Sequence, residues 1–128
     1  MAAETSSGQM SDELRTKVLS LKAKDIGLTK ENFPHPVIAI IMETGFPEGS
    51  FTLSSVADGS TSLYFSNGGG VIGGGEHDAV HEASDYLLSG AQHFHDKTKL
   101  VTDFPKPEEG NVIFYLVTFD GVRSYIAS

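Results

Sequence analysis

The sequence predicts an α+β fold in which a single five-stranded antiparallel sheet carries two helices, in the order α-β-β-β-α-β-β. Short runs rich in β-branched and aromatic residues alternate with turn dipeptides, which is typical of strands joined by hairpins. Two longer stretches carry apolar residues at spacings of three and four, which is typical of amphipathic helices. A chain of 128 residues with 39% hydrophobic residues suits one domain built from two packed layers.

The N-terminal region predicts a tail followed by a helix. Residues 1–10 are small and polar, so we expect a disordered tail there and a single domain over 11–128. The stretch SDELRTKVLSLKAKDIG predicts an amphipathic helix that begins with a Ser-Asp cap and stops at Gly27. Its apolar stripe consists of Leu14, Val18 and Leu21. Two prolines after the helix predict an extended connector.

Three strands are predicted next. VIAIIMETG, at 37–45, is a nearly unbroken β-branched run, which indicates a central strand or one covered on both faces. Residues 49–57 and 60–67 flank the dipeptide Asp58-Gly59, which suits a tight hairpin. The three strands together predict an antiparallel meander.

A second helix and a second hairpin complete the predicted fold. Residues 76–95 carry an apolar stripe that would cover the sheet. The stripe consists of Val80, Ala83, Leu87, Ala91 and Phe94. Residues 111–119 and 122–128 flank Asp120-Gly121 and predict a tight hairpin. We expect the last strand, VRSYIAS, to be an open edge of the sheet, where a partner strand could pair.

Composition and charge exclude several classes of function. The net charge is −8, and no Lys or Arg occurs between Glu31 and Asp96, so nucleic acid and anionic membranes are not expected partners. The absence of cysteine excludes disulfides, thiolate zinc sites and a cysteine nucleophile. The sequence has no membrane-spanning run and no signal-peptide pattern, so we expect a cytoplasmic protein.

The glycine stretch GGGVIGGG, at 68–75, has competing interpretations. It matches GxGxxG, but acidic residues follow where a phosphate would sit, which disfavours nucleotide binding. We favour a structural role, in which glycines let a strand leave the sheet and enter a helix, with Val71 and Ile72 as an apolar plug. The alternative is a pocket for an uncharged or cationic small ligand. Its candidate ligand-binding residues are Gly68, Gly69, Gly70, Gly73, Gly74, Gly75 and Glu76.

Two histidines and a carboxylate follow one side of the predicted second helix. His77, His81 and Asp85 are spaced four apart, and two imidazoles at this spacing can share a divalent metal with a carboxylate ligand. The pattern is not HExxH, and a catalytic zinc would need a further ligand, such as His35, His93 or His95. A solvated flank of the helix is the favoured interpretation. We therefore expect no cofactor, with a divalent metal at this stripe as the alternative.

The sequence also resembles known proteins, in one short stretch and in the order of its elements. LYFSNGGGVIGGGEH, at 63–77, together with TFDG, at 118–121, resembles a family of short bacterial proteins whose activity is not known. The order of helices and strands resembles that of profilin-like and roadblock-like modules, in which a five-stranded sheet carries helices and often dimerises. The resemblance implies a small module that associates with itself.

These observations favour a non-enzymatic protein. No GxSxG motif occurs, and Ser84, His81 and Asp85 do not converge on one helix, so nucleophilic catalysis has little support. We predict a small non-catalytic protein-interaction or assembly module that forms a homodimer or binds a protein partner. The alternative is a metal- or small-ligand-binding protein, with hydrolysis as its chemistry, whose site lies between residues 68–75 and the histidine stripe.

Overall fold

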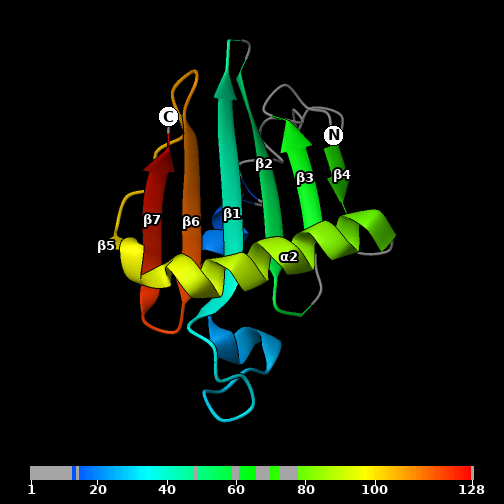
Figure 1. Cartoon of the computed structure of the whole chain (residues 1–128), viewed down its shortest axis with the longest axis vertical. Coiled ribbons are helices and arrows are strands. Elements are labelled where there is room, and N and C mark those ends of the chain that lie inside the picture. Colours follow the sequence, from blue (N-terminus) through cyan, green and yellow to red (C-terminus); the bar gives the residue numbers. More distant parts are fainter. Residues whose placement is uncertain are drawn as a thin grey trace.

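The computed structural model describes residue 13 and residues 15–47, 49–58, 61–65, 70–72 and 78–127. Within this part, strands at 64–65 and 70–72 and helix residues 78–81, 83 and 84 are described by their backbone alone. The described strands form one seven-stranded antiparallel sheet with the order β4-β3-β2-β1-β6-β7-β5. Helix α2 lies across one face of this sheet (Figure 1).

The elements follow one another along the chain as two groups of strands separated by a helix. The first group is β1 (Val37–Phe46), β2 (Gly49–Val56), β3 (Thr61–Phe65) and β4 (Gly70–Ile72). Helix α2 (Asp78–Phe94) continues into a short 3-10 helix, η4 (His95–Lys97). The second group is β5 (Lys99–Val101), β6 (Val112–Thr118) and β7 (Gly121–Ala127).

The α+β class with one antiparallel sheet is confirmed, but the predicted five strands, two helices and order α-β-β-β-α-β-β are wrong. The additional strands are β4 and β5, each of three residues. Runs this short show no alternation from which a strand can be predicted. Each exists because a longer neighbour supplies its hydrogen bonds: β3 pairs with β4, and β7 pairs with β5.

The N-terminal segment, residues 15–36, also departs from the predicted continuous helix. Residues 15–19 are helical, but the chain turns at Ser20, whose hydroxyl donates to the Thr16 carbonyl oxygen at 2.8 Å. A separate 3-10 helix, η2 (Ala23–Ile26), begins where the Lys22 N–H donates to the Asp25 carboxylate. Competition by serine and aspartate side chains for backbone partners explains the break. The predicted stop is confirmed, because Gly27 caps η2 in the left-handed region at φ 73°.

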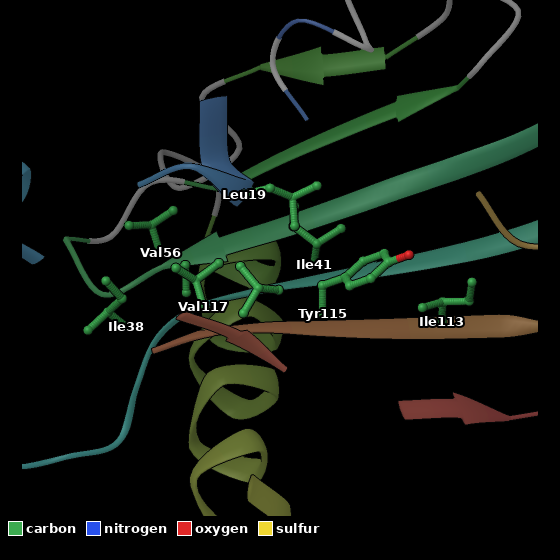
Figure 2. Close-up of a cluster of buried hydrophobic side chains, with 9 residues drawn as sticks. Leu19, Ile38, Ile41, Val56, Ile113, Tyr115 and Val117 are labelled. Atoms are coloured by element: carbon green, nitrogen blue, oxygen red, sulfur yellow. The ribbon is translucent and has the colours of Figure 1, made fainter. Parts of the chain in front are cut away.

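Strand β1 is the middle strand of the sheet, and residues 37–41 have no exposed surface. The prediction of a central strand covered on both faces is therefore confirmed. On one face, Leu19 of the N-terminal segment packs over the sheet (Figure 2). This core also contains Ile38, Ala39, Ile41, Val56, Ile113, Tyr115, Val117 and Val122. On the other face, Val37, Ile40 and Leu116 pack against Ala91 of α2.

Helix α2 is held to the sheet by apolar packing and by one side-chain amide. Leu87, Ala91 and Phe94 of the predicted stripe contact the sheet, while the side chains of Val80 and Ala83 lie outside the described part. Gln92 exchanges two hydrogen bonds of 2.8 Å with the backbone of Val37. No helix among the described residues is long and apolar enough to cross a membrane.

Candidate functional site

The outer strands β7 and β5 gather exposed apolar side chains. Of the four large hydrophobic residues that are exposed in the described part of the chain, three lie on these strands. They are Leu100, Tyr125 and Ile126, with 59%, 45% and 59% of their surface exposed. We call these three residues and the free end of β7 the edge surface. Grouped exposed apolar side chains are a common feature of contact surfaces, so this side of the molecule is the candidate site.

The backbone of β7 extends beyond its neighbour. Strand β5 pairs with β7 only from Val122 to Ser124. Residues 125–127 pair with β6 on their inner side and have no described strand on their outer side. The prediction that the last strand forms the sheet edge is thus corrected: β5 covers its first half, and its second half continues past β5.

The edge surface is apolar on both faces of the sheet. Tyr125 lies opposite Phe114, with ring centroids 6.5 Å apart, on the face that carries α2. Ile126 lies opposite Ile113, which belongs to the core on the other face. Alternation along a strand produces this arrangement, because neighbouring side chains point to opposite faces.

A depression of about 460 Å³ adjoins the edge surface on the face of Ile126. Ile113, Tyr115 and Ile126 line it on this face, and Leu100 borders it from β5, where it lies opposite Arg123. The tyrosine hydroxyl donates to the Pro105 carbonyl oxygen, so it is not free to bind a partner. Burial raises the pKa of Tyr115 above 10, which keeps its phenol neutral. The depression therefore offers an incoming molecule mainly apolar contacts.

The glycine stretch lies largely outside the described residues. Gly68, Gly69, Gly73, Gly74, Gly75 and Glu76 are not described. Gly70, with residues 71 and 72, forms β4, which pairs antiparallel with β3. Residues 71 and 72 are therefore part of a strand and not the predicted apolar plug. A dinucleotide loop follows a strand of a parallel sheet, so this antiparallel pairing also removes the context that the GxGxxG match would need.

The histidine stripe is described only in part. His77 lies outside the described residues, His81 is described by its backbone within α2, and Asp85 is exposed on that helix. Among the described residues, no group of three or more histidine, aspartate or glutamate side chains could hold a metal ion. The metal hypothesis stays a prediction: Zn²⁺ or Ni²⁺ would raise the melting temperature, and His81→Ala would abolish that rise.

The other three histidines lie near the end of α2. His35 and His93 line one shallow surface depression, and His35 and His95 line another. His95 Nδ1 lies 3.2 Å from the exposed carboxylate of Asp96. They do not extend the stripe into a described metal site.

The most buried charge in the described part is Glu43 of β1, which has no exposed surface. Its Oε2 accepts hydrogen bonds of 2.7 Å from Arg15 Nε and from the Thr52 hydroxyl. Arg15 also donates to the backbone oxygens of Phe104 and Pro105. The ion pair therefore joins the N-terminal segment, the sheet and the segment after β5, which is a structural role.

No protein-family model, curated protein or solved structure matches this chain. The edge surface is therefore identified from the structure alone. Tyr125 and Ile126 belong to a strand that the sequence marked as an edge, whereas Leu100 was missed because β5 was not predicted. Lys97 and Lys99 stand on either side of Thr98, so the sequence around Leu100 shows no apolar pattern from which a strand can be predicted.

Proposed function

We propose that this chain is a small non-catalytic interaction module that associates with itself through the edge surface. The observation that carries the proposal is the gathering of Leu100, Tyr125 and Ile126 along one edge of the sheet. Apolar surface on a strand that is open to pairing is used in proteins to add a strand from a partner. The edge surface combines both properties.

The geometry favours the end of β7 over β5 as the strand that pairs. Strand β5 is three residues long and carries the exposed Lys99, and both features protect an edge from pairing. Residues 125–127 lie beyond β5 and carry two exposed apolar side chains. A strand added there would gain main-chain hydrogen bonds and apolar contacts at the same time.

A second copy of the chain would match the apolar side chains on both faces of the sheet at the end of β7. In an antiparallel pair related by a two-fold axis, one residue lies opposite itself. Pairing centred on Ile126 would bring the two isoleucine side chains together on the face of the depression. The two Tyr125 side chains would lie on the opposite face, beside Phe114. The sheet would then continue from one protomer into the next.

A single cysteine tests this arrangement, because the chain contains no other. Residues directly opposite each other in antiparallel strands have Cα atoms about 4.5–5.5 Å apart. A disulfide needs about 4.4–6.8 Å. Ile126→Cys should therefore form a covalent dimer upon mild oxidation. Tyr86→Cys is the matched control, because Tyr86 is 83% exposed on α2 and outside the edge surface.

Non-reducing electrophoresis of the two oxidised cysteine variants measures cross-linking. Light scattering of the wild type and of the lysine variants measures their oligomeric state. We expect a dimer for the wild type and for Tyr86→Lys, and a monomer for Ile126→Lys, in which two ammonium groups would oppose each other. A wild type that stays monomeric at high concentration would reject self-association. Equal cross-linking of the 126 and 86 cysteines would reject this edge as the interface.

A further inference from the structure

A second surface lies between the N-terminal segment and the β6–β7 hairpin. The two elements enclose a groove of about 620 Å³, lined on one side by residues 19–24 and 28–30 and on the other by 117–122. Pockets of this volume are large enough for a small organic molecule. We call it the lysine groove, after the side chains described next.

The floor of the lysine groove is apolar. Leu19, Val117 and Val122 belong to the core, with 5%, 1% and 7% of their surface exposed. Leu21 and Leu28 pack against the same core from the N-terminal segment and are only partly buried. Hydrocarbon placed in the groove would lie against these side chains and lose contact with water.

Three lysines surround this floor. Lys22, Lys24 and Lys30 are exposed and line the groove, whereas Asp120 is the only carboxylate among its lining residues. In the part of the chain that the structure describes, none of the three ammonium groups forms an ion pair. These lysines are three of only nine basic residues in a chain with a net charge of −8. Unpaired cations beside an apolar floor are therefore a local exception to the acidic surface.

The cations are also placed at the walls of the groove. Lys30 Nζ lies 6.0 Å from the centroid of the Phe119 ring, on the hairpin side. Lys22 and Lys24 flank the start of η2, on the opposite wall. The Asp25 carboxylate accepts the Lys22 backbone N–H at 3.0 Å, so it serves the local turn. An anionic group at the mouth of the groove would lie near ammonium groups of the N-terminal segment, of which Lys30 reaches across to the hairpin.

From this geometry we infer that the lysine groove binds a small organic anion with an apolar tail, of the class of a medium-chain carboxylate. The tail would lie on the leucine and valine floor, and the carboxylate would be paired by the three lysines. The positive charge of the three lysines favours an anionic amphiphile over a neutral or a cationic one. A neutral amphiphile would gain nothing from the ammonium groups, and a cationic one would be repelled by them. The inference is independent of self-association through the edge surface.

Calorimetric titration of the full chain with decanoate, below its micelle concentration, tests the inference. Acetate carries the same head group without the tail, and decyltrimethylammonium carries the same tail with the opposite charge. We expect decanoate to bind with an affinity that falls as salt is added. Neither of the other probes should bind measurably. Equal binding of acetate, equal binding of the cationic probe, or no binding of decanoate would each overturn the inference.

A matched pair of triple variants locates the site. Lys22→Gln, Lys24→Gln and Lys30→Gln together remove the groove cations, and we expect the dissociation constant of decanoate to rise about tenfold, which corresponds to about 1.4 kcal/mol. Lys17→Gln, Lys97→Gln and Lys99→Gln change the net charge equally at exposed positions outside the groove. This control should bind as the wild type does. An equal loss in both triple variants would show a general charge effect and reject the groove as the site.

Discussion

Arg15 Nε donates to Glu43 Oε2 at 2.7 Å, although the two residues are 28 positions apart in the sequence. The glutamate side chain is fully buried, and its Oε1 has no hydrogen-bond partner among the described residues. Its negative charge is therefore balanced mainly by Arg15 and by the Thr52 hydroxyl. The same guanidinium donates to the Phe104 carbonyl oxygen at 2.6 Å. One side chain thus connects three parts of the chain that are distant in sequence.

Replacing Arg15 by methionine should destabilise the fold strongly. The change removes the partner of a buried carboxylate but keeps much of the side-chain volume. We expect the free energy of unfolding to fall by about 3–5 kcal/mol, as is typical when one member of a buried ion pair is lost. Urea unfolding measures this directly. Lys17→Met is the control in the same helical turn, where the side chain is exposed and the change should stay within about 0.5 kcal/mol.

A double variant separates charge from packing. If the unpaired charge of Glu43 causes the loss, Arg15→Met combined with Glu43→Gln should be more stable than Arg15→Met alone. The reason is that an amide costs less to bury than a carboxylate. No recovery in the double variant would instead assign the loss to packing and to the bonds with the 104–105 backbone.

Ionisation of Tyr115 should lower the stability of the fold at alkaline pH. Burial raises the pKa of its phenol above 10, opposed by nearby Arg15 and assisted by Glu43. The folded state therefore holds the phenolic proton more tightly than the unfolded chain does. The resulting stabilisation is complete below the unfolded value of about 10 and is lost as pH rises through the folded value.

Tyr115→Phe tests this dependence, because it removes the titrating group and retains the ring. Melting temperatures measured at about pH 8 and about pH 10.5 should fall further for the wild type than for the variant. At about pH 8 the variant should be less stable, since the hydrogen bond to the Pro105 carbonyl oxygen is lost. Parallel pH curves for the two proteins would show that another group controls the alkaline transition.

Two glycines offer a matched pair of alanine substitutions with opposite expected signs. A Cβ at Gly45 would overlap the Glu108 carbonyl oxygen and lie 2.7 Å from the carbonyl carbon, so the backbone would have to move. We expect Gly45→Ala to cost about 1–3 kcal/mol. A Cβ at Gly90 meets nothing within 4 Å, and Gly90 lies inside α2. Gly90→Ala should stabilise the protein by up to about 1 kcal/mol, because alanine favours the helix.

Chemical denaturation of both alanine variants gives the comparison. A neutral Gly45→Ala would mean that the segment around Glu108 can move away from β1 at little cost. In that case the contact would contribute little to holding this segment over the sheet.

The elements that could be predicted from the sequence are those long enough to show a repeating pattern of apolar residues. The β-branched run from Val37 marked the central strand, and the spacing of Leu87, Ala91 and Phe94 marked the helix that covers it. A tight hairpin between β6 and β7 was also predicted, because Asp-Gly sequences favour hairpins, but its turn lies at 119–120, one residue before the predicted 120–121, and Gly121 belongs to β7. These features depend on neighbours in the sequence, so local periodicity is sufficient to detect them.

Features that depend on distant neighbours were not predictable. Strand β4 exists because β3 offers it an edge, whereas its glycine surroundings indicate a loop. Leu100 joins the edge surface only because β5 returns to β7 after α2. Glu43 sits between Met42 and Thr44 in a pattern that resembles a solvent-facing position, and only the fold brings Arg15 to it. Neither the edge surface nor the buried ion pair could therefore be assembled from spacing alone.

Gln92 should prove as important for docking α2 as its apolar neighbours. Its Oε1 accepts the Val37 N–H at 2.8 Å and its Nε2 donates to the Val37 carbonyl oxygen at 2.8 Å, where β1 begins with no exposed surface. In Gln92→Leu both backbone groups would be buried without partners, at about 1–3 kcal/mol each. Ser89→Ala, at an exposed position on α2, is the control. Hydrogen exchange at the Val37 amide distinguishes local from global loss. Faster exchange at this amide, beyond the change in overall stability, would show that Gln92 closes the start of β1, whereas a uniform change would assign the loss to helix packing.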